Sequence, residues 1–101
     1  MITISIKKTD TCVEVSLIGK LDNESYATAQ AEMQPLSEYA GGVIVIDCTQ
    51  LEYIASSGLR LLLQLRKESA SEGGKVIIRN ASKDVMDVFT IVGFRSLFEF
   101  R

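Results

Sequence analysis

The stretch Val43-Ile44-Val45-Ile46-Asp47, followed after a short loop by Tyr53-Ile54-Ala55-Ser56-Ser57-Gly58-Leu59-Arg60, decides how the rest of the chain is arranged. Four β-branched residues closed by an acid are typical of a buried parallel strand. The next run, Leu61-Leu62-Leu63-Gln64-Leu65, predicts a helix rich in leucine. Two serines and a glycine therefore lie where a loop becomes a helix.

At the start of a helix the amide groups lack intrahelical partners and the helix dipole is positive. Ser56 is predicted to be the N-cap, with Ser57 and Gly58 at the first helical positions. Spacing alone leaves two interpretations open. Either the serines only cap the helix, or one of them carries a function.

The start of the chain predicts two strands. Apolar and polar residues alternate over residues 2–6 and again over residues 13–17. The turn at Asp10-Thr11 is short, so the two strands should pair antiparallel. Both strands carry polar residues on one face, which indicates a sheet covered by helices on one side only.

A first helix is predicted after these strands. An apolar stripe runs over residues 26–36 at helical spacing, and Asp22 or Asn23 can cap it. Pro35 removes one helical hydrogen bond, so the helix should kink or divide there. Asp22 has a second interpretation, as a carboxylate that faces a partner beside Ser56.

The remaining pattern completes one α/β domain over residues 1–101. The further elements expected are the leucine helix at about 57–71, a strand at 75–79, a helix capped by Ser82 and stopped by Gly93, and a last strand at 97–100. The order is thus β-β-α-β-α-β-α-β. Since strand–helix–strand units cross over right-handed, the helices should lie mainly on one face of a single mixed, mostly parallel sheet.

Composition argues against several classes of protein. The 101 residues are 47% hydrophobic, enough for one modest core, and no apolar run approaches the ~18–20 residues of a membrane span. A net charge of −2 provides no basic face for nucleic acid. There is no histidine, and Cys12 and Cys48 match no metal or redox spacing, so no metal or cofactor is predicted. With no signal-peptide block, a reduced, cytoplasmic protein is expected.

An enzyme is one further interpretation. Asp22 and Asp47 are predicted at the C-terminal ends of strands, where α/β sheets usually bind ligands, and two carboxylates with a serine could serve a phosphotransfer or hydrolase site. However, only Lys20 could approach the serine as a base, and the chain has neither a Gly-x-Ser-x-Gly elbow nor a phosphate-binding glycine loop. We therefore predict that the chain is not an enzyme.

Two motifs resemble those of STAS domains, specifically the bacterial anti-sigma factor antagonists. One is Asp47-Cys48-Thr49, a short loop and then Tyr53-Ile54-Ala55-Ser56-Ser57-Gly58-Leu59. The other is Gly19-Lys20-Leu21-Asp22, which matches a Gly-x-Leu-Asp element at the same position in the family. The resemblance implies the STAS fold over essentially the whole chain.

The family resemblance also implies a modified residue. Helices of this family open with Asp-Ser-Ser-Gly or Asp-Ser-Thr-Gly, and the first serine is phosphorylated by a partner kinase that is also the anti-sigma factor. By position that serine is Ser56, with Ser57 as the second choice. The chain departs from the family at Ala55, where an acid is usual. It also stops after the last strand, where many relatives carry one more helix over a surface that is here exposed or covered by a partner.

The implied partners are an anti-sigma factor serine kinase and a separate serine phosphatase, with the domain itself a monomer or weak dimer. The unmodified domain would bind the kinase and free the sigma factor, and phosphorylation would reverse this. The partner-binding residues implied are Asp22, Tyr53, Ala55, Ser56, Ser57, Gly58 and Arg60. The alternative is a STAS module that acts as a scaffold without switching, as in transporters and stress-signalling assemblies.

The physics of the switch follows from its place on the helix. A phosphate brings about −1.5 to −2 charge to a helix start that favours anions, so the domain should stay folded. Control must then act at the interface, where a dianion facing an acidic or apolar partner surface costs several kcal/mol. Since ~1.4 kcal/mol is tenfold in affinity, one phosphate is enough to eject a partner.

Overall fold

The strand β2 (Val13–Leu21) organises the sheet in the computed structural model, which describes residues 2–101 and leaves Met1 outside the described part. It pairs antiparallel with β1 (Ile2–Lys8) and parallel with both β3 (Val43–Asp47) and β4 (Leu51–Ile54). On the far side of β3 follow β5 (Lys75–Arg79) and β6 (Glu99–Phe100), both parallel. The sheet order is β1-β2-β3-β5-β6, and β4 continues the line of β3 along β2. The predicted mixed, mostly parallel sheet is confirmed.

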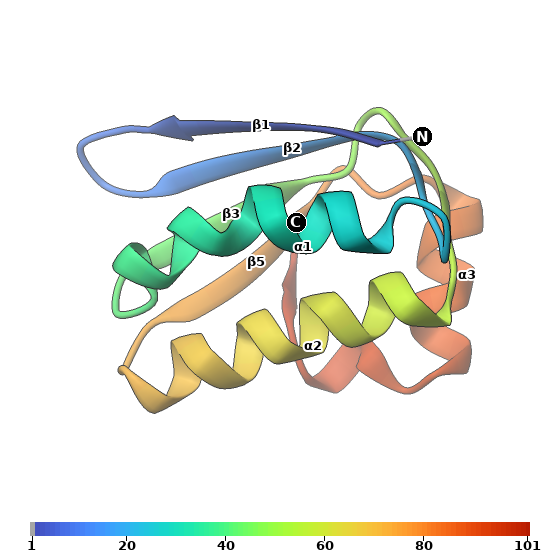
Figure 1. Ribbon diagram of the computed structural model, residues 1–101. Helices are drawn as coiled ribbons and strands as arrows, with labels where there is room; N and C mark the ends of the chain where they lie inside the picture. Colours follow the sequence, from blue (N-terminus) through green and yellow to red (C-terminus); the bar gives the residue numbers. More distant parts are fainter. Residues whose placement is uncertain (1) are drawn as a thin grey trace.

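The helical elements cover one face of this sheet. Their bounds are α1 (Tyr26–Met33), the 3-10 helix η1 (Gln34–Tyr39), α2 (Ser56–Ser71), α3 (Lys83–Ile91) and the 3-10 helix η2 (Phe94–Ser96). Figure 1 shows α1 and α2 side by side over the sheet, while α3 lies at its end, in contact with β4. Within residues 2–101, no helix combines the length and the apolar character needed to cross a bilayer.

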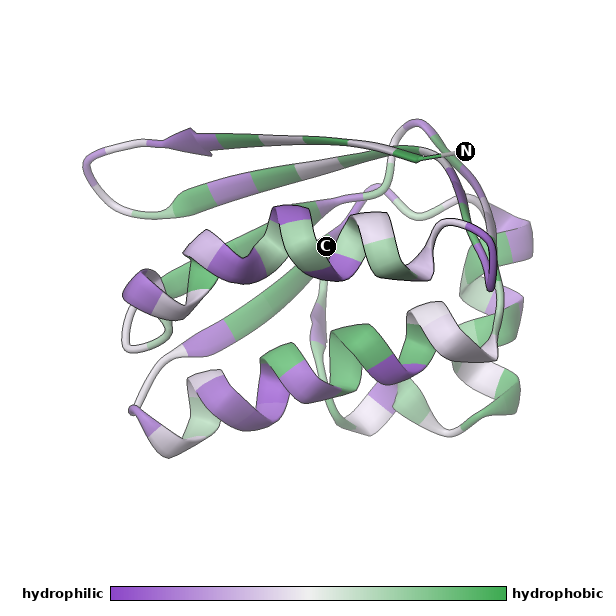
Figure 2. Cartoon of the chain, viewed as in Figure 1, coloured by the Kyte–Doolittle hydropathy of each residue, from purple (hydrophilic) through white to green (hydrophobic). Residues whose placement is uncertain are grey.

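The core lies between the sheet and the helices because the strands alternate. Figure 2 shows hydrophobic and hydrophilic residues alternating along β2. Val13, Val15 and Leu17 are buried in the core, and the residues between them are only half-buried. Their neighbours on β3 and β5 continue the apolar layer, and Leu62 and Phe89 from the helices are fully buried against it. Each such side chain contributes roughly 1.5–3 kcal/mol to folding.

Several predicted element boundaries are confirmed. Pro35 divides the first helical region, because α1 ends at Met33 and η1 begins with the proline in its first turn. Ser82 caps α3, since its Oγ accepts a hydrogen bond from the amide of Val85 at 3.2 Å. These positions were readable because proline and capping serines act through their own local chemistry.

Two elements differ from the expectation. The predicted order lacks β4, whose four residues show no alternation and become a strand only by pairing with the end of β2. The last strand is shorter than predicted, because the chain forms η2 and only two residues enter β6. Phe98 instead packs in an aromatic cluster. The centroid of its ring lies 5.6 Å from that of Phe94 and 6.3 Å from that of Phe100.

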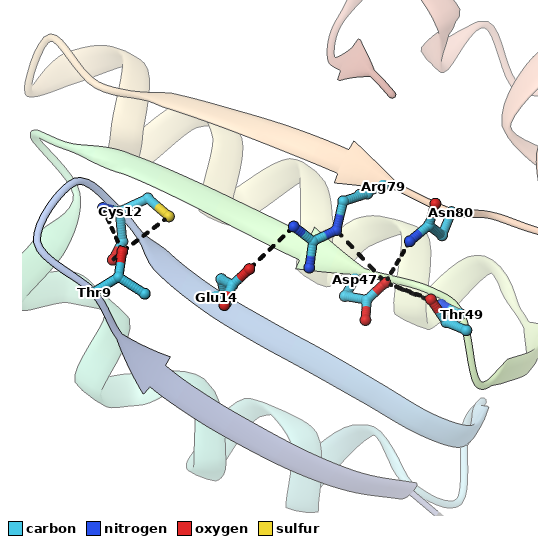
Figure 3. Close-up of polar contacts among 7 residues, drawn as sticks. All are labelled: Thr9, Cys12, Glu14, Asp47, Thr49, Arg79 and Asn80. Atoms are coloured by element: carbon cyan, nitrogen blue, oxygen red, sulfur yellow. Dashed lines mark hydrogen bonds and ion pairs between the residues drawn. The ribbon is translucent and has the colours of Figure 1, made fainter.

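The face of the sheet away from the helices carries a chain of polar contacts, part of which Figure 3 shows. Arg79 on β5 lies between Glu14, 3.0 Å away on β2, and Asp47, 3.9 Å away on β3. Asp47 also accepts hydrogen bonds from the Thr49 hydroxyl at 2.7 Å and from the Asn80 amide at 3.4 Å. Partial burial acts to raise the pKa of Asp47, but these bonds and the Arg79 charge outweigh it, so its pKa lies below the usual value.

The lowered pKa of Asp47 predicts a specific acid sensitivity. A carboxyl whose pKa is lower in the folded state stabilises the fold above its unfolded pKa, near ~3.9, and this contribution is lost as the pH falls through the folded value. Asp47→Asn should therefore lose less stability than the parent protein between about pH 6 and about pH 3 in urea unfolding. Asp10→Asn, in the exposed β1–β2 turn, is the control and should follow the parent curve; equal losses for both variants would contradict the assignment.

Candidate functional site

The start of α2 is attached to the end of β2. In the parallel pairing of β2 with β4, Lys20 lies beside Tyr53 and Leu21 beside Ile54. The amide of Ala55 then donates to the carbonyl oxygen of Leu21 at 2.9 Å. The position of the first turn of α2 is thus set by backbone hydrogen bonds to β2.

Gly58 allows α2 to approach this strand pair closely. A Cβ at position 58 would lie 2.7 Å from Cγ of Leu21 and 3.0 Å from Cγ1 of Ile54. Contacts between carbon atoms are favourable only near ~3.5–4.0 Å, so any side chain here would push the helix away. The glycine of the Ser-Ser-Gly motif is therefore a packing residue.

The helix begins one residue earlier than predicted. Its N-cap is Ala55, with extended backbone angles (φ −99°, ψ 176°) and no side-chain cap, so the expectation that Ser56 is the N-cap is wrong. The bond from Ala55 to Leu21 holds residue 55 extended, and Ser56 becomes the first helical residue. Within residues 2–101, no side chain caps the amides of Ser56, Ser57 and Gly58, which by helix geometry also lack intrahelical acceptors.

The two serines occupy different environments. Ser56 is exposed to solvent, whereas Ser57 is only 8% exposed. The Ser57 hydroxyl is buried and has no hydrogen-bond partner among the described residues. A buried hydroxyl left unpaired costs about 1–3 kcal/mol. Sequence alone could not separate the two serines, but solvent access does.

Asp22 follows Leu21 directly and therefore lies next to this helix start. Its side chain stabilises the turn that leads into α1. Its Oδ1 accepts hydrogen bonds from the amide of Ser25 at 3.0 Å and from the Ser25 hydroxyl at 3.2 Å. The amide of Ser25 is the main reason that the pKa of Asp22 lies below its usual range. Neither Asp22 nor Asn23 is the N-cap of α1, as one of them was expected to be; that position belongs to Ser25.

Further candidate residues are exposed around the helix start. Tyr53 is 51% exposed, and Arg60 is exposed one helical turn after Ser56. Residues four apart lie on the same side of a helix, so the guanidinium of Arg60 can approach an anion attached to Ser56. From the sequence, Lys20 was considered only as a possible base for the serine, but the β2–β4 pairing puts it beside Tyr53. Recognising residues 51–54 as a strand parallel to the end of β2 would have predicted this pair.

The two carboxylates of the enzyme interpretation do not share a site. Asp47 pairs with Ser16 on β2, five residues before Leu21 and hence about 16 Å from the strand end at ~3.3 Å per residue. Its contacts lie on the face of the sheet away from the helices (Figure 3). Cys48, directly after Asp47, is fully buried, and this burial raises the pKa of its thiol to about 12.

The STAS domain family model matches residues 3–101. The chain belongs to the STAS domain family. Two relatives span most of this STAS domain. A Bordetella bronchiseptica protein named as an anti-sigma factor antagonist, BtrV, is 27% identical over 94% of this chain and 82% of its own length. The anti-sigma-B factor antagonist of Bacillus subtilis is 24% identical over 97% of this chain and 89% of its own length.

Solved structures share this STAS fold. The unphosphorylated anti-sigma factor antagonist SpoIIAA superposes with a TM-score of 0.79 at 23% identity, over 98% of this chain and 88% of that one. The phosphorylated form of SpoIIAA from Bacillus superposes with a TM-score of 0.73 at 22% identity, over 98% and 91% of the two chains. At these identities the likeness establishes the fold alone.

The uncapped start of α2 predicts a stabilising substitution. Ala55 already has the extended conformation of an N-cap, so Ala55→Asn and Ala55→Asp should each supply the missing acceptor and raise the free energy of unfolding by about 1 kcal/mol. Any excess for the aspartate measures the favourable charge at the helix start. Chemical denaturation of the three proteins checks this; two variants no more stable than the parent would show that the amides are already satisfied.

The close contact at Gly58 predicts the opposite effect. Gly58→Ala gains roughly 1 kcal/mol of helix propensity but forces a methyl group into Leu21 and Ile54, which typically costs more, so the variant should be less stable by about 1–2 kcal/mol. Gly42→Ala is the control, because a Cβ there would lie at an ordinary 3.6 Å from the nearest atom, the Tyr39 carbonyl oxygen. A Gly58→Ala variant as stable as this control would contradict the packing role.

Proposed function

We propose that this STAS domain is an anti-sigma factor antagonist whose unphosphorylated form binds a kinase-type anti-sigma factor, and that phosphorylation of Ser56 switches binding off. The observation that carries the proposal is the difference between the serines. Ser56 presents its hydroxyl to solvent in the first turn of α2, whereas that of Ser57 is buried. A kinase needs an accessible hydroxyl, and of the two only Ser56 offers one.

The helix start is suited to carry the resulting charge. The amides of the first turn are uncapped, and the positive end of the helix dipole lies there. Arg60 adds a cation on the same side of the helix. A phosphate on Ser56 therefore meets groups that stabilise it, and the switch needs no change of fold.

The partner-binding surface in this proposal comprises the candidate residues on the β2–β4 strand ends and the first turns of α2. Tyr53, with 51% of its surface exposed, is the natural anchor, because aromatic residues often carry most of the energy at interfaces. Asp22, Ala55 and Arg60 surround Ser56 on the same strand ends and helix. Ser57 and Gly58 are buried between α2 and the sheet, so they contribute to this surface by positioning the first turn of the helix.

The relatives support this assignment. Both relatives are named as anti-sigma factor antagonists, and they align with this chain over nearly all of its length. SpoIIAA has been solved in unphosphorylated and phosphorylated forms, and this chain superposes on both. In the proposed cycle the anti-sigma factor kinase phosphorylates Ser56 and rebinds its sigma factor, and a serine phosphatase restores the unmodified domain.

Phosphosite mapping tests the modified residue. The protein is incubated with ATP and a kinase-type anti-sigma factor from the same organism, and the products are mapped by mass spectrometry. We expect one phosphate on Ser56, none on Ser56→Ala, and full modification of Ser57→Ala. Ser57→Ala should also be more stable by about 1 kcal/mol, because it removes an unpaired buried hydroxyl. Phosphate on another residue would remove the switch from the proposal.

A charge mimic separates binding from folding. Ser56→Asp should weaken binding to the kinase at least about tenfold, because a charge then faces the partner surface. Its melting temperature should change by no more than about 5 °C, since an acid is favourable at a helix start. Thr11→Asp, in the exposed β1–β2 turn, adds the same charge elsewhere and should bind like the parent. Binding unaffected by Ser56→Asp would favour the scaffold module that does not switch.

A further inference from the structure

The strand β1 forms a free edge of the sheet. Among residues 2–101 it pairs with β2 on one side only, and α1 lies against it from below (Figure 1). Seven residues, Ile2–Lys8, therefore present a row of backbone N–H and C=O groups that no other strand of the described chain meets. Such an edge is a template for pairing with another strand.

The sequence of this edge is nearly symmetric. Ile2-Thr3-Ile4-Ser5-Ile6 reads almost the same in both directions, with Ile4 at its centre. We propose that two copies of the chain associate through β1, paired antiparallel about a two-fold axis at Ile4. In this register Ile2 of one copy lies opposite Ile6 of the other, and Thr3 lies opposite Ser5. Each contact occurs twice, as in any two-fold interface.

The faces of the strand select this register. The isoleucines point toward the helices, because Ile4 pairs with the buried Leu17 of β2 and Ile6 with the buried Val15. Directly opposite residues of an antiparallel pair share a face, so the register centred on Ile4 joins two apolar rows and keeps the helices of both copies on one side. A slip by one residue would set Ile4 against Ser5 or Thr3 and turn the isoleucines of the two copies to opposite faces of the sheet. Lys7 and Lys8 lie outside the five paired positions, and the lysines of the two copies are at opposite ends of the two-stranded interface.

A hollow beside β1 fits the second copy. It measures about 300 Å³ and is lined by Ile2, Glu24, Ser25 and Thr28. Gln30, two residues after Thr28 and thus on the other side of α1, lines the groove toward α2, so the hollow lies on the β1 side of the helix. In the proposed register Ile6 of the second copy stands across from Ile2, about 4.5–5.5 Å between Cβ atoms, and its side chain enters this hollow.

The association is expected to be weak and to stop at the dimer. One pair of short strand edges buries less than the ~800 Å² per partner of a standard stable interface, so a transient dimer is expected. The opposite edge of the sheet, β6, has two residues, and its Glu99 is paired with Arg101 directly after the strand, so this short charged edge does not extend the dimer into a fibre. Neither β1 nor the hollow contains a residue of α2, and the nearest part of the candidate site is Asp22, which is hydrogen-bonded to Ser25 of the hollow.

Paired charges on the exposed face of β1 test the register. In Thr3→Lys/Ser5→Lys each lysine faces a lysine of the second copy, whereas in Thr3→Lys/Ser5→Glu each faces a glutamate. Both residues are exposed, so the folded monomer tolerates the changes. We expect the dimer dissociation constant from sedimentation equilibrium, over roughly 10 μM to 1 mM, to rise about fivefold in the first variant and fall about fivefold in the second.

Matched controls carry the same charges at exposed positions away from the edge: Thr11→Lys/Gln50→Lys and Thr11→Lys/Gln50→Glu. Each should dimerise like the parent protein. If Thr3→Lys/Ser5→Lys fails to fold, the gain of Thr3→Lys/Ser5→Glu over its own control decides the question. A parent protein that is monomeric at all concentrations, or a dimer equally strong in both β1 variants, would overturn the proposal.

Discussion

The contact on which the site depends is made by Leu21 at the end of β2. Its carbonyl oxygen accepts the amide of Ala55, and its fully buried side chain lies against the place where Gly58 has no Cβ. One residue therefore fixes where α2 begins and how closely the helix approaches the sheet. β2 can do this because its nine residues are long enough to pair with β3 first and with β4 afterwards. The serines owe their positions to this strand end more than to their own capping chemistry.

Most of the fold could be predicted from the sequence, because it rests on local signals. Alternation in β1 and β2, the β-branched run of β3, the division at Pro35 and the cap at Ser82 each act over a few residues. β4 could not be predicted, because its residues are extended only through their partner on β2. The N-cap was misplaced for the same reason: a serine is the better cap in isolation, but the hydrogen bond from Ala55 to Leu21 decides.

The candidate site was predictable in its members but not in their roles. The sequence placed Ser56 and Ser57 at a helix start, yet their exposure depends on which of them faces the strand ends, and that follows from the rotation of the helix by about 100° per residue. Asp22 was expected beside Ser56 or as a cap, and the structure places it on the adjoining strand end while it also holds the turn at Ser25. Asp47, which is part of the same family motif, makes its contacts on the face of the sheet away from the helices.

The exposed first turn of α2 also sets a time scale. Ser56 sits on a rigid helix but carries a short side chain in open solvent, where rotamers exchange within picoseconds to nanoseconds. A phosphate attached to Ser56 would meet uncapped amides that already point outward. No segment would have to open, refold or isomerise before the phosphorylated state is complete. The speed of such a signal would be set by how often the modifying enzymes encounter the protein, and the scaffold itself would add no delay.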